Sequence, residues 1–528
     1  HPEAYTTSGP KLMGRNAAGE SFLRGFLKYT KASNFLSVQV ESADHAEHFA
    51  SAAKHAGRTE QVRSFSKQNL GRLQEAGIIY FPGPALAEHA FHRRLYGDGR
   101  WSLSGITHTT SSSIAMDAIA DLLTAPIRPW DSLICTSTAV KKNVEAILQA
   151  QADYLRERLG ISKLVLPLLP VIPLGIHTED FAFTSQQKRK ARERLGVNNN
   201  ELVVLYTGRL SFHAKAHPLA MYLGLEAAAK KSNKNVVLVE CGWHANQDIA
   251  DSFAEAAKIA CPSVRVVNVD GREQESRENA WGSADVFCSL SDNIQETFGI
   301  VPIEAMAAGL PVVVSDWDGY KDTVRDGVDG FRVKTMAPSQ GLATDLAHRH
   351  ALGVDNYDHY CGYSSSLVAV DVGGVERAFT KLFSSEELRK EMGSAGKKRA
   401  QNDYDWREII RRYEELWNKQ ERIRLAEHKN NARSVTPGVW PARLDPTVSF
   451  LNYPTKVLTV DTPLRLVPPD SVAALSILRR YKKLVMVSFA ALVMPTDEEL
   501  EHVLSAMSSK PQAASIILEG IEESRRPN

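Results

Sequence analysis

Short apolar runs alternate with amphipathic stretches over most of the 528-residue chain. Most of these runs are continuous rather than alternating in polarity, which is typical of strands that helices bury on both faces. Because strands that alternate with helices form parallel sheets, we predict doubly wound α/β domains. The predicted strands are residues 77–81, 132–135, 202–206, 236–240, 264–268, 284–288 and 311–315.

Proline-rich stretches divide this pattern. Three prolines between residues 166 and 173 forbid a continuous helix there and favour a connection between two domains. Seven more prolines between 437 and 469 break the chain into extended pieces, and helical patterns resume at 471–480 and 496–508. We therefore expect domains at 1–172 and 173–405, a helix at 406–425 and a C-terminal appendage at 426–528.

Composition narrows the class of protein. Hydrophobic residues make up 43% and charged residues 24%, which is ordinary for a globular chain. With 63 basic and 62 acidic residues, the formal net charge of +1 gives no reason to expect a nucleic-acid partner. The five cysteines are too widely spaced for a zinc site, so we expect buried thiols in a reducing compartment, the cytoplasm.

The strongest chemical signal lies between residues 291 and 314. A loop with Glu296 and Gly299 follows a strand. Pro302 suits the first turn of a short helix, and Gly309 suits the residue just past the end of that helix. The amides and dipole of a helix N-terminus form a natural phosphate site.

Glu296 and Glu304 are 304 − 296 = 8 positions apart, or about 12 Å along a helix. Two carboxylates at that separation can hold two parts of one extended ligand, such as a sugar and a ribose. The alternative is that both are acids on a helix surface, although Glu304 lies in the apolar sequence Ile303-Glu-Ala305.

Three further segments carry candidate chemistry. Gly208, Arg209 and Lys215 place a glycine turn and two cations after a strand, and both cations suit phosphate oxygens. Residues 12–23 read as a glycine-flanked loop that opens a helix. His108 ends a β-like run before several hydroxyl residues, and it is interpreted either as an active-site group or as a surface histidine beside a helix cap.

The stretch from Glu296 to Pro311 resembles the Glu-x7-Glu motif of family 4 retaining glycosyltransferases, which have the GT-B fold. The resemblance covers roughly residues 13–420. It implies two Rossmann-like domains that face each other across a cleft. The first would lie on the acceptor side and the second would bind a nucleotide sugar, with 406–425 returning toward the first domain.

The resemblance also implies roles for individual residues. Glu304 would accept hydrogen bonds from the ribose, Glu296 would hold hydroxyls of the donor sugar, and the two cations would neutralise the leaving diphosphate. The implied catalytic residues are His108, Arg209, Lys215 and Glu296. The implied donor-binding residues are Gly19, Gly208, Thr297, Phe298, Gly299, Ile300, Val301 and Glu304.

The expected activity is retaining transfer of a sugar from a nucleotide-diphosphate sugar to a glycan, lipid-linked or small-molecule acceptor. We expect no metal and no cofactor besides the donor, and we interpret Asp316-Trp-Asp318 as a loop at a strand end. A lipid-linked acceptor would bring the protein to the inner face of a membrane. The alternatives are a sugar-nucleotide epimerase of the same two-domain architecture and a non-catalytic sugar-nucleotide-binding protein.

Overall fold

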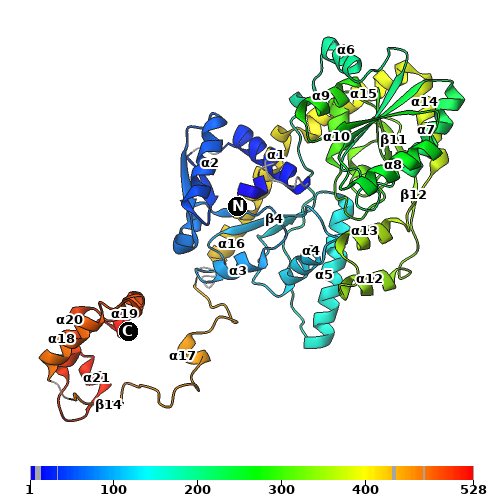
Figure 1. The fold of residues 1–528 in the computed structure, drawn as a ribbon. Helices are drawn as coiled ribbons and strands as arrows, with labels where there is room; N and C mark the ends of the chain where they lie inside the picture. Colours follow the sequence, from blue (N-terminus) through cyan, green and yellow to red (C-terminus); the bar gives the residue numbers. More distant parts are fainter. Residues whose placement is uncertain (1, 6–13, 32–33, 431–435, 468–469, 527–528) are drawn as a thin grey trace. The chain divides into compact units, whose positions relative to one another are not determined.

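The computed structural model describes residues 2–5, 14–31, 34–430, 436–467 and 470–526. The chain forms two compact units, His1–Trp440 and Pro441–Asn528. The first unit contains two α/β lobes, which are the blue-to-cyan and green-to-yellow parts of Figure 1. Its division into two Rossmann-like lobes is the predicted GT-B arrangement.

The C-terminal lobe is built on one parallel sheet of six strands in the order β8-β7-β6-β9-β10-β11. Numbered along the chain, this is the Rossmann order 3-2-1-4-5-6, whose strand order reverses between β6 and β9. The strands are β6 Leu202–Thr207, β7 Val236–Gly242, β8 Arg265–Asp270, β9 Val286–Ser289, β10 Val312–Ser315 and β11 Gly330–Val333.

Helices cover both faces of this sheet (Figure 1). Successive side chains of β6 point to opposite faces, so Val204 packs with Tyr222 and Phe379 in one core. Val203 packs with Met306 in the other core. The predicted doubly wound fold is confirmed. The helices are α6 Ser185–Arg194, α7 Leu219–Ser232, α8 Gln247–Ala260, α9 Gln274–Ser283, α10 Ile300–Ala307, α11 Tyr320–Thr323, α12 Thr344–Ala351, α13 Tyr357–Ser365, α14 Val372–Ser384 and α15 Glu386–Arg399.

The N-terminal lobe has two parallel sheets, β1-β2 and β3-β4-β5. Its strands are β1 Phe35–Gln39, β2 Gln61–Phe65, β3 Ile78–Tyr80, β4 Ser102–Ile106 and β5 Ser132–Ile134. The apolar-run pattern missed β1 and β2, because Ser37, Gln39 and Arg63 interrupt them. The helices are α1 Gly14–Tyr29, α2 Ala43–His55, α3 Ala87–Arg94, α4 Ser113–Ala120 and α5 Thr138–Leu159.

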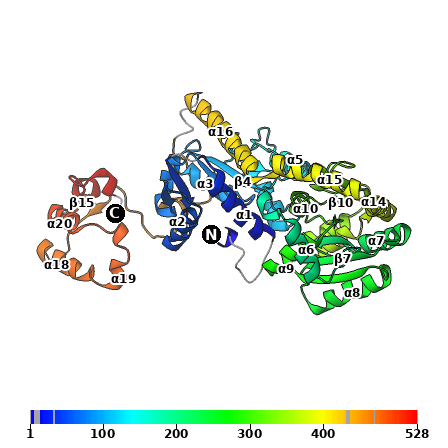
Figure 2. The same cartoon turned by 90° about the horizontal axis from the view of Figure 1, so that it is seen from above.

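Helix α16, Trp406–Asn430, returns from the C-terminal lobe to the N-terminal lobe (Figure 2). Trp406 and Tyr413 pack with Phe22 of α1 in an apolar cluster. Further along, Gln420 donates hydrogen bonds to the carbonyls of Leu103 and Trp130, at 2.9 and 2.8 Å. The helix therefore completes the core of the N-terminal lobe, although it follows the C-terminal lobe in the sequence.

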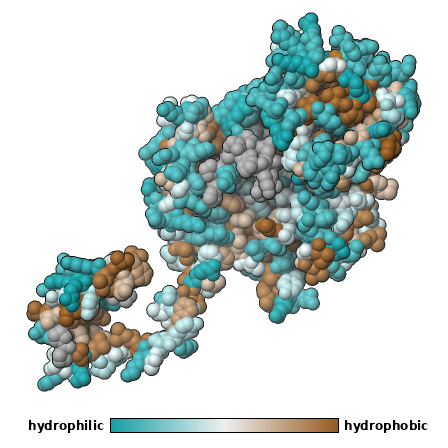
Figure 3. Space-filling view, in the orientation of Figure 1, coloured by the Kyte–Doolittle hydropathy of each residue, from teal (hydrophilic) through white to brown (hydrophobic). Residues whose placement is uncertain are grey.

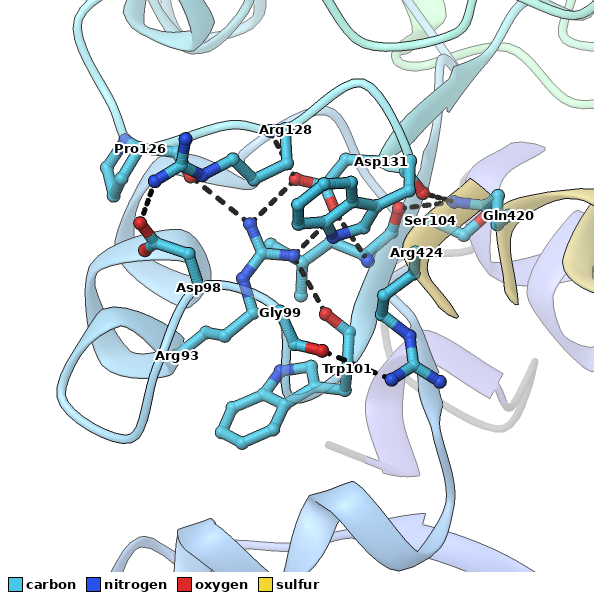
Figure 4. Close-up of polar contacts among 12 residues, drawn as sticks. Arg93, Asp98, Gly99, Trp101, Ser104, Pro126, Arg128, Asp131, Gln420 and Arg424 are labelled. Atoms are coloured by element: carbon cyan, nitrogen blue, oxygen red, sulfur yellow. Dashed lines mark hydrogen bonds and ion pairs between the residues drawn. The ribbon is translucent and has the colours of Figure 1, made fainter. Parts of the chain in front are cut away.

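Buried charges reinforce this attachment (Figure 4). Arg93 and Asp131 are fully buried and form a two-pronged ion pair, with N···O distances of 2.6 and 2.8 Å. Asp131 also accepts from the amides of Leu103 and Arg128. Close by, Arg424 donates to the carbonyl of Gly99 at 3.1 Å.

The chain beyond α16 stays on the N-terminal lobe for a few residues. The Gly438 amide donates to the Arg94 carbonyl at 2.8 Å, and the Trp440 ring stacks on Phe91 at 4.9 Å between centroids. The second unit thus begins at Pro441, later than the expected start of the appendage at 426.

The second unit has short elements and a small core. Thr496 caps α20 and forms a reciprocal capping box with Glu499. Figure 3 shows apolar side chains on the surface of this unit, and Phe489 is 82% exposed. No helix in the described part of the chain is long and apolar enough to cross a membrane. The elements are α17 Pro446–Ser449, β14 Pro463–Leu464, α18 Ser471–Tyr481, α19 Val485–Ser488, α20 Asp497–Ala506, β15 Gln512–Ala513 and α21 Ala514–Ile517.

Candidate active site

The candidate site lies at the carboxyl ends of β6 and β9. In an open parallel sheet, ligands bind outside these ends at the point where the strand order reverses. The loops that follow the two strands contact each other, because the Asn293 side-chain amide donates to the His213 carbonyl at 2.9 Å. The Ser291 hydroxyl donates to the Lys215 carbonyl at 3.3 Å. The fold thus joins two motifs that are about 80 residues apart.

Lys215 and Glu296 form an ion pair, with Nζ 3.4 Å from Oε2. The other carboxylate oxygen, Oε1, accepts from the amides of Gly299 at 3.0 Å and Thr297 at 3.3 Å. Burial opposes ionisation of Glu296, but Lys215 and the amides of Thr297 and Phe298 outweigh it and lower the pKa of the carboxyl. A carboxylate therefore faces the start of α10, beside a cation.

Gly299 fixes the shape of this loop. It has a φ of 77° and precedes α10 as its N-cap. A Cβ at this position would lie 1.8 Å from Cε1 of Tyr320, so the backbone packs directly on that ring. Helix α10 begins at Ile300, so Pro302 lies in its first turn as predicted, together with the amides of Ile300 and Val301. Amides there have no partner within the helix.

Arg209 lies beside the same loop. The preceding Gly208 has a φ of 151°. Its carbonyl oxygen packs so closely on Gly242 that a Cβ added to Gly242 would lie 1.9 Å from that oxygen. The Arg209 guanidinium donates to the Ala214 carbonyl and to Oε1 of Gln295, both at 3.1 Å. The structure brings Arg209, Lys215 and Glu296 into one cluster, as the sequence predicted.

Glu304 lies on α10, within the helix that Glu296 precedes. It is half-buried, and its carboxyl group forms no hydrogen bond or ion pair with the described residues. Burial raises its pKa to about 7, which the positive charge of Arg277 partly counteracts. A half-buried carboxyl without a protein partner can accept hydrogen bonds from a ligand.

The N-terminal lobe contacts the Glu296 loop from the other side. The Thr297 hydroxyl donates to the His108 carbonyl at 3.2 Å, and the Thr136 hydroxyl donates to the Thr297 carbonyl at 3.3 Å. His108 follows β4 and lines a cavity of about 1220 Å³ in its own lobe. The two lobes thus meet at the residues predicted to bind the donor.

One predicted feature is wrong. The structure places Gly19 inside α1, Gly14–Tyr29, whereas the sequence suggested a loop there. The Gly19 amide is therefore engaged in the helix ladder and is not free to approach a phosphate. Residues 12 and 13 of that motif lie outside the described residues.

Asp318 forms a contact with the other lobe that the sequence did not predict. It has a φ of 39° and accepts from the Ser137 hydroxyl of the other lobe at 2.9 Å. Burial raises its pKa to about 7. Asp316 lies instead near Arg332, at 3.5 Å, so the two aspartates have different partners. An aspartate before a glycine suggests a turn, but nothing local indicates a partner 181 residues away.

Comparison with known proteins agrees with this geometry. Residues 187–347, which include the loops after β6 and β9, match the family model for glycosyl transferases group 1. Within the C-terminal lobe, these residues resemble the group 1 glycosyltransferases. The predicted resemblance to family 4 glycosyltransferases is thereby confirmed.

Curated relatives match only part of this chain. D-inositol 3-phosphate glycosyltransferase of Geodermatophilus obscurus is 30% identical over 232 residues, which cover 39% of this chain and 47% of the relative. Alpha-monoglucosyldiacylglycerol synthase of Acholeplasma laidlawii is 27% identical over 165 residues, which cover 30% of this chain and 39% of that protein. The chain thus spans about half the length or less of these relatives.

Two solved structures resemble the chain over a longer stretch. Anabaena Alr3699/HepE in complex with UDP and glucose is 16% identical with a TM-score of 0.49, and the match covers 78% of this chain and 97% of that one. Sucrose-phosphate synthase from Thermosynechococcus elongatus is also 16% identical, with a TM-score of 0.43 and coverage of 73% and 99%.

Proposed function

We propose that the chain is a retaining glycosyltransferase that moves a sugar from a nucleotide-diphosphate sugar to an acceptor without a metal ion. The observation that carries this proposal is the cluster of Lys215 and Glu296 at the start of α10. A cation, a carboxylate and free helix amides meet where an open α/β sheet binds its ligand.

The chemistry follows from the charge that develops. As the bond between sugar and diphosphate breaks, negative charge grows on the leaving group. Arg209, Lys215 and the first amides of α10 stabilise that charge, and in many enzymes preorganised groups of this kind account for most of the rate acceleration. Before the donor binds, Gln295 and Glu296 hold the two cations in place.

The remaining groups bind parts of the donor. Glu296 accepts hydrogen bonds from hydroxyls of the sugar, and Glu304 accepts them from the ribose. His108 contacts the sugar near its reacting carbon from the N-terminal lobe. In a retaining reaction, the acceptor attacks on the face from which the diphosphate departs.

The acceptor is a glycan, a lipid-linked molecule or a small molecule. The names of the two relatives include both an inositol phosphate and a diacylglycerol lipid, so relatedness does not select among these classes. We place the protein in the cytoplasm, where a lipid-linked acceptor would bring it to the inner face of a membrane.

A panel of nucleotide sugars in a thermal-shift assay tests the donor site. A ligand that binds only the folded chain stabilises it and so raises its melting temperature. At a ligand concentration of 100 Kd the stabilisation is about 2.7 kcal/mol. We expect one nucleotide-diphosphate sugar to stand out and Glu304→Gln to reduce the shift. No shift with any donor would contradict the proposal.

Donor turnover distinguishes the alternative functions. A transferase releases the nucleoside diphosphate faster when an acceptor is added. An epimerase converts the donor without needing an acceptor, and a binding protein leaves it unchanged. Either of the last two outcomes would replace the transferase assignment.

A further inference from the structure

Two helices of the C-terminal lobe form an arm that contacts the N-terminal lobe. The arm consists of residues 337–368 and contains α12 and α13. An antiparallel pair of two-residue strands, β12 Thr335–Met336 and β13 Ala369–Val370, closes its base. Both ends of the arm are thus anchored in the C-terminal lobe, while α13 lies beside the N-terminal lobe near α4 (Figure 1).

Internal contacts hold the two helices of the arm against each other. Arg349 donates two hydrogen bonds to the carboxylate of Asp355, at 2.8 and 2.6 Å, and Asp355 is buried. The ring of His350 stacks on that of Tyr360, with 4.0 Å between the centroids. A two-pronged ion pair adds geometric specificity, so the start of α13 has a defined position.

Tyr357, the first residue of α13, contacts the N-terminal lobe. Its hydroxyl lies 3.0 Å from the Ser111 hydroxyl and 3.4 Å from the Thr109 hydroxyl. Ser111 is buried, and residues 107–112 connect β4 to α4. Tyr357 therefore contacts the loop that carries His108.

The same hydroxyl is linked to Arg209. It forms a hydrogen bond with the side chain of Gln295, whose Oε1 accepts from the Arg209 guanidinium at 3.1 Å. The terminal torsion of a glutamine side chain is soft, so partners on both sides are needed to fix the direction of its amide. A row of hydrogen bonds thus runs from Arg209 through Gln295 and Tyr357 to Ser111.

A close contact also fixes α13 on the loop after β6. A Cβ added to Gly362 would lie 3.0 Å from the Cβ of His213, so the helix backbone packs directly on that residue. Cys361, next to Gly362, is fully buried. The arm therefore rests on the loop between Arg209 and Lys215, within reach of the side chains that precede α10.

We propose that Tyr357 is a positioning residue of the transfer reaction, an inference that rests on the proposed function. Through Gln295 it directs Arg209 toward the departing diphosphate, and through Ser111 it couples that direction to the loop of His108. Its partners belong to different lobes, so the row is complete only when the lobes are together. A cation oriented in advance stabilises developing charge without reorganisation during the reaction.

The test compares Tyr357→Phe with the matched control Tyr360→Phe. Tyr360 lies on the same helix, and its hydroxyl forms no hydrogen bond with the described residues. We expect Tyr357→Phe to lower kcat about three- to tenfold, which is the effect of one lost hydrogen bond. The KM for the donor and the melting temperature should stay nearly unchanged, whereas a merely structural role would change both. Tyr360→Phe should match the wild type throughout.

Calorimetric titration with inorganic pyrophosphate gives a second measurement that needs no turnover. Pyrophosphate resembles the leaving diphosphate, so Tyr357→Phe should weaken its binding by a similar factor. Because residues that act through one another are not additive, Tyr357→Phe should have no further effect on kcat or on this affinity when Gln295 is already replaced by alanine.

Equal kcat and equal pyrophosphate affinity for the two tyrosine variants would overturn the proposal. An undiminished effect of Tyr357→Phe in the Gln295→Ala background would also overturn it. A wild type that transfers no sugar would contradict the proposed function instead, and pyrophosphate binding would then decide the role of Tyr357. Weaker binding in Tyr357→Phe alone would support that role, and equal or undetectable binding would overturn it.

Discussion

At the scale of single residues, the site pairs its cations with acceptors that a donor must displace. Lys215 lies 3.4 Å from Glu296, and Arg209 donates to Gln295. These contacts hold the cations in position without saturating them, because Lys215 remains 37% exposed. Glu304, in contrast, has no protein partner to exchange among the described residues. Removal of a cation and removal of Glu304 should therefore change different kinetic constants.

We expect Lys215→Ala to lower kcat by about 10²–10³, the range seen when one donor to a developing negative charge is lost. Glu304→Gln should raise KM and leave kcat nearly intact, because the ribose does not change during the reaction. The loss of affinity should be roughly 1–3 kcal/mol. Steady-state kinetics on folded variants decide this, and a wild-type kcat in Lys215→Ala would remove its role.

The pH dependence of donor binding should report on Glu304. Its pKa of about 7 means that it is mostly protonated at pH 6 and mostly ionised at pH 8. In the proposed function the ionised form accepts hydrogen bonds from both ribose hydroxyls, so donor affinity should rise up to about tenfold over this range. Calorimetric titration checks this, with Glu304→Gln as the control that should lack the rise.

The raised pKa of Glu304 makes stability fall with rising pH, whereas donor affinity should rise. The folded pKa lies above the ordinary value of 4.5, so between these values the folded chain binds more protons than the unfolded chain. The stability of the wild type relative to Glu304→Gln should therefore fall as pH rises from about 5 to 7. A flat difference would show that Glu304 titrates normally.

The proposed metal independence also belongs to the residue scale, because in that proposal two cationic side chains and helix amides perform the role of a metal ion. Transfer activity should survive exhaustive EDTA treatment. Loss of activity that magnesium or manganese restores would contradict this and would return Asp316 and Asp318 to consideration as ligands.

At the scale of elements, α16 ties the two ends of the first unit together. It leaves the C-terminal lobe at Trp406 and reaches the carbonyls of β4 and its neighbours through Gln420 and Arg424. Those carbonyls lie beside the buried Arg93–Asp131 pair (Figure 4). The lobe therefore depends on a charge pair whose members cannot be solvated separately.

Asp131→Asn should destabilise the N-terminal lobe by about 3–5 kcal/mol, because it leaves the Arg93 charge buried and unpaired. Chemical denaturation followed by tryptophan fluorescence measures this. Asp153→Asn, which removes an exposed partner of Arg156 on α5, is the control and should cause no measurable change. A loss below 1 kcal/mol for Asp131→Asn would mean that the pair is not a structural requirement.

At the scale of the whole molecule, the second unit should be dispensable for donor binding. A chain that ends at Trp440 keeps the stacking on Phe91 and every donor-site group, so its thermal shift with the donor should match the full chain. A chain that ends at Arg424 loses the contacts of residues 425–440 and should melt at a lower temperature. Loss of donor binding in the chain that ends at Trp440 would show that the second unit belongs to the site.

The sequence by itself predicted most strands of the C-terminal lobe and the segment that holds Glu296 and Glu304. Strands such as β6 and β7 are buried on both faces, so they are continuous apolar runs that a single sequence reveals. The Glu296–Glu304 segment is also local, because one loop and one short helix hold both acids. The strand order around that segment and the pairing of Glu296 with Lys215, 81 residues away, came only from the tertiary structure.

Only the tertiary structure decided the N-terminal lobe. Polar residues interrupt β1 and β2, so their pairing with each other and not their composition makes them strands. Gly19 lies in a helix because α1 packs across both sheets, which outweighs the preference of glycine for loops. The Asp318–Ser137 contact and the attachment of α16 join residues far apart in sequence, and no local pattern encodes such partners.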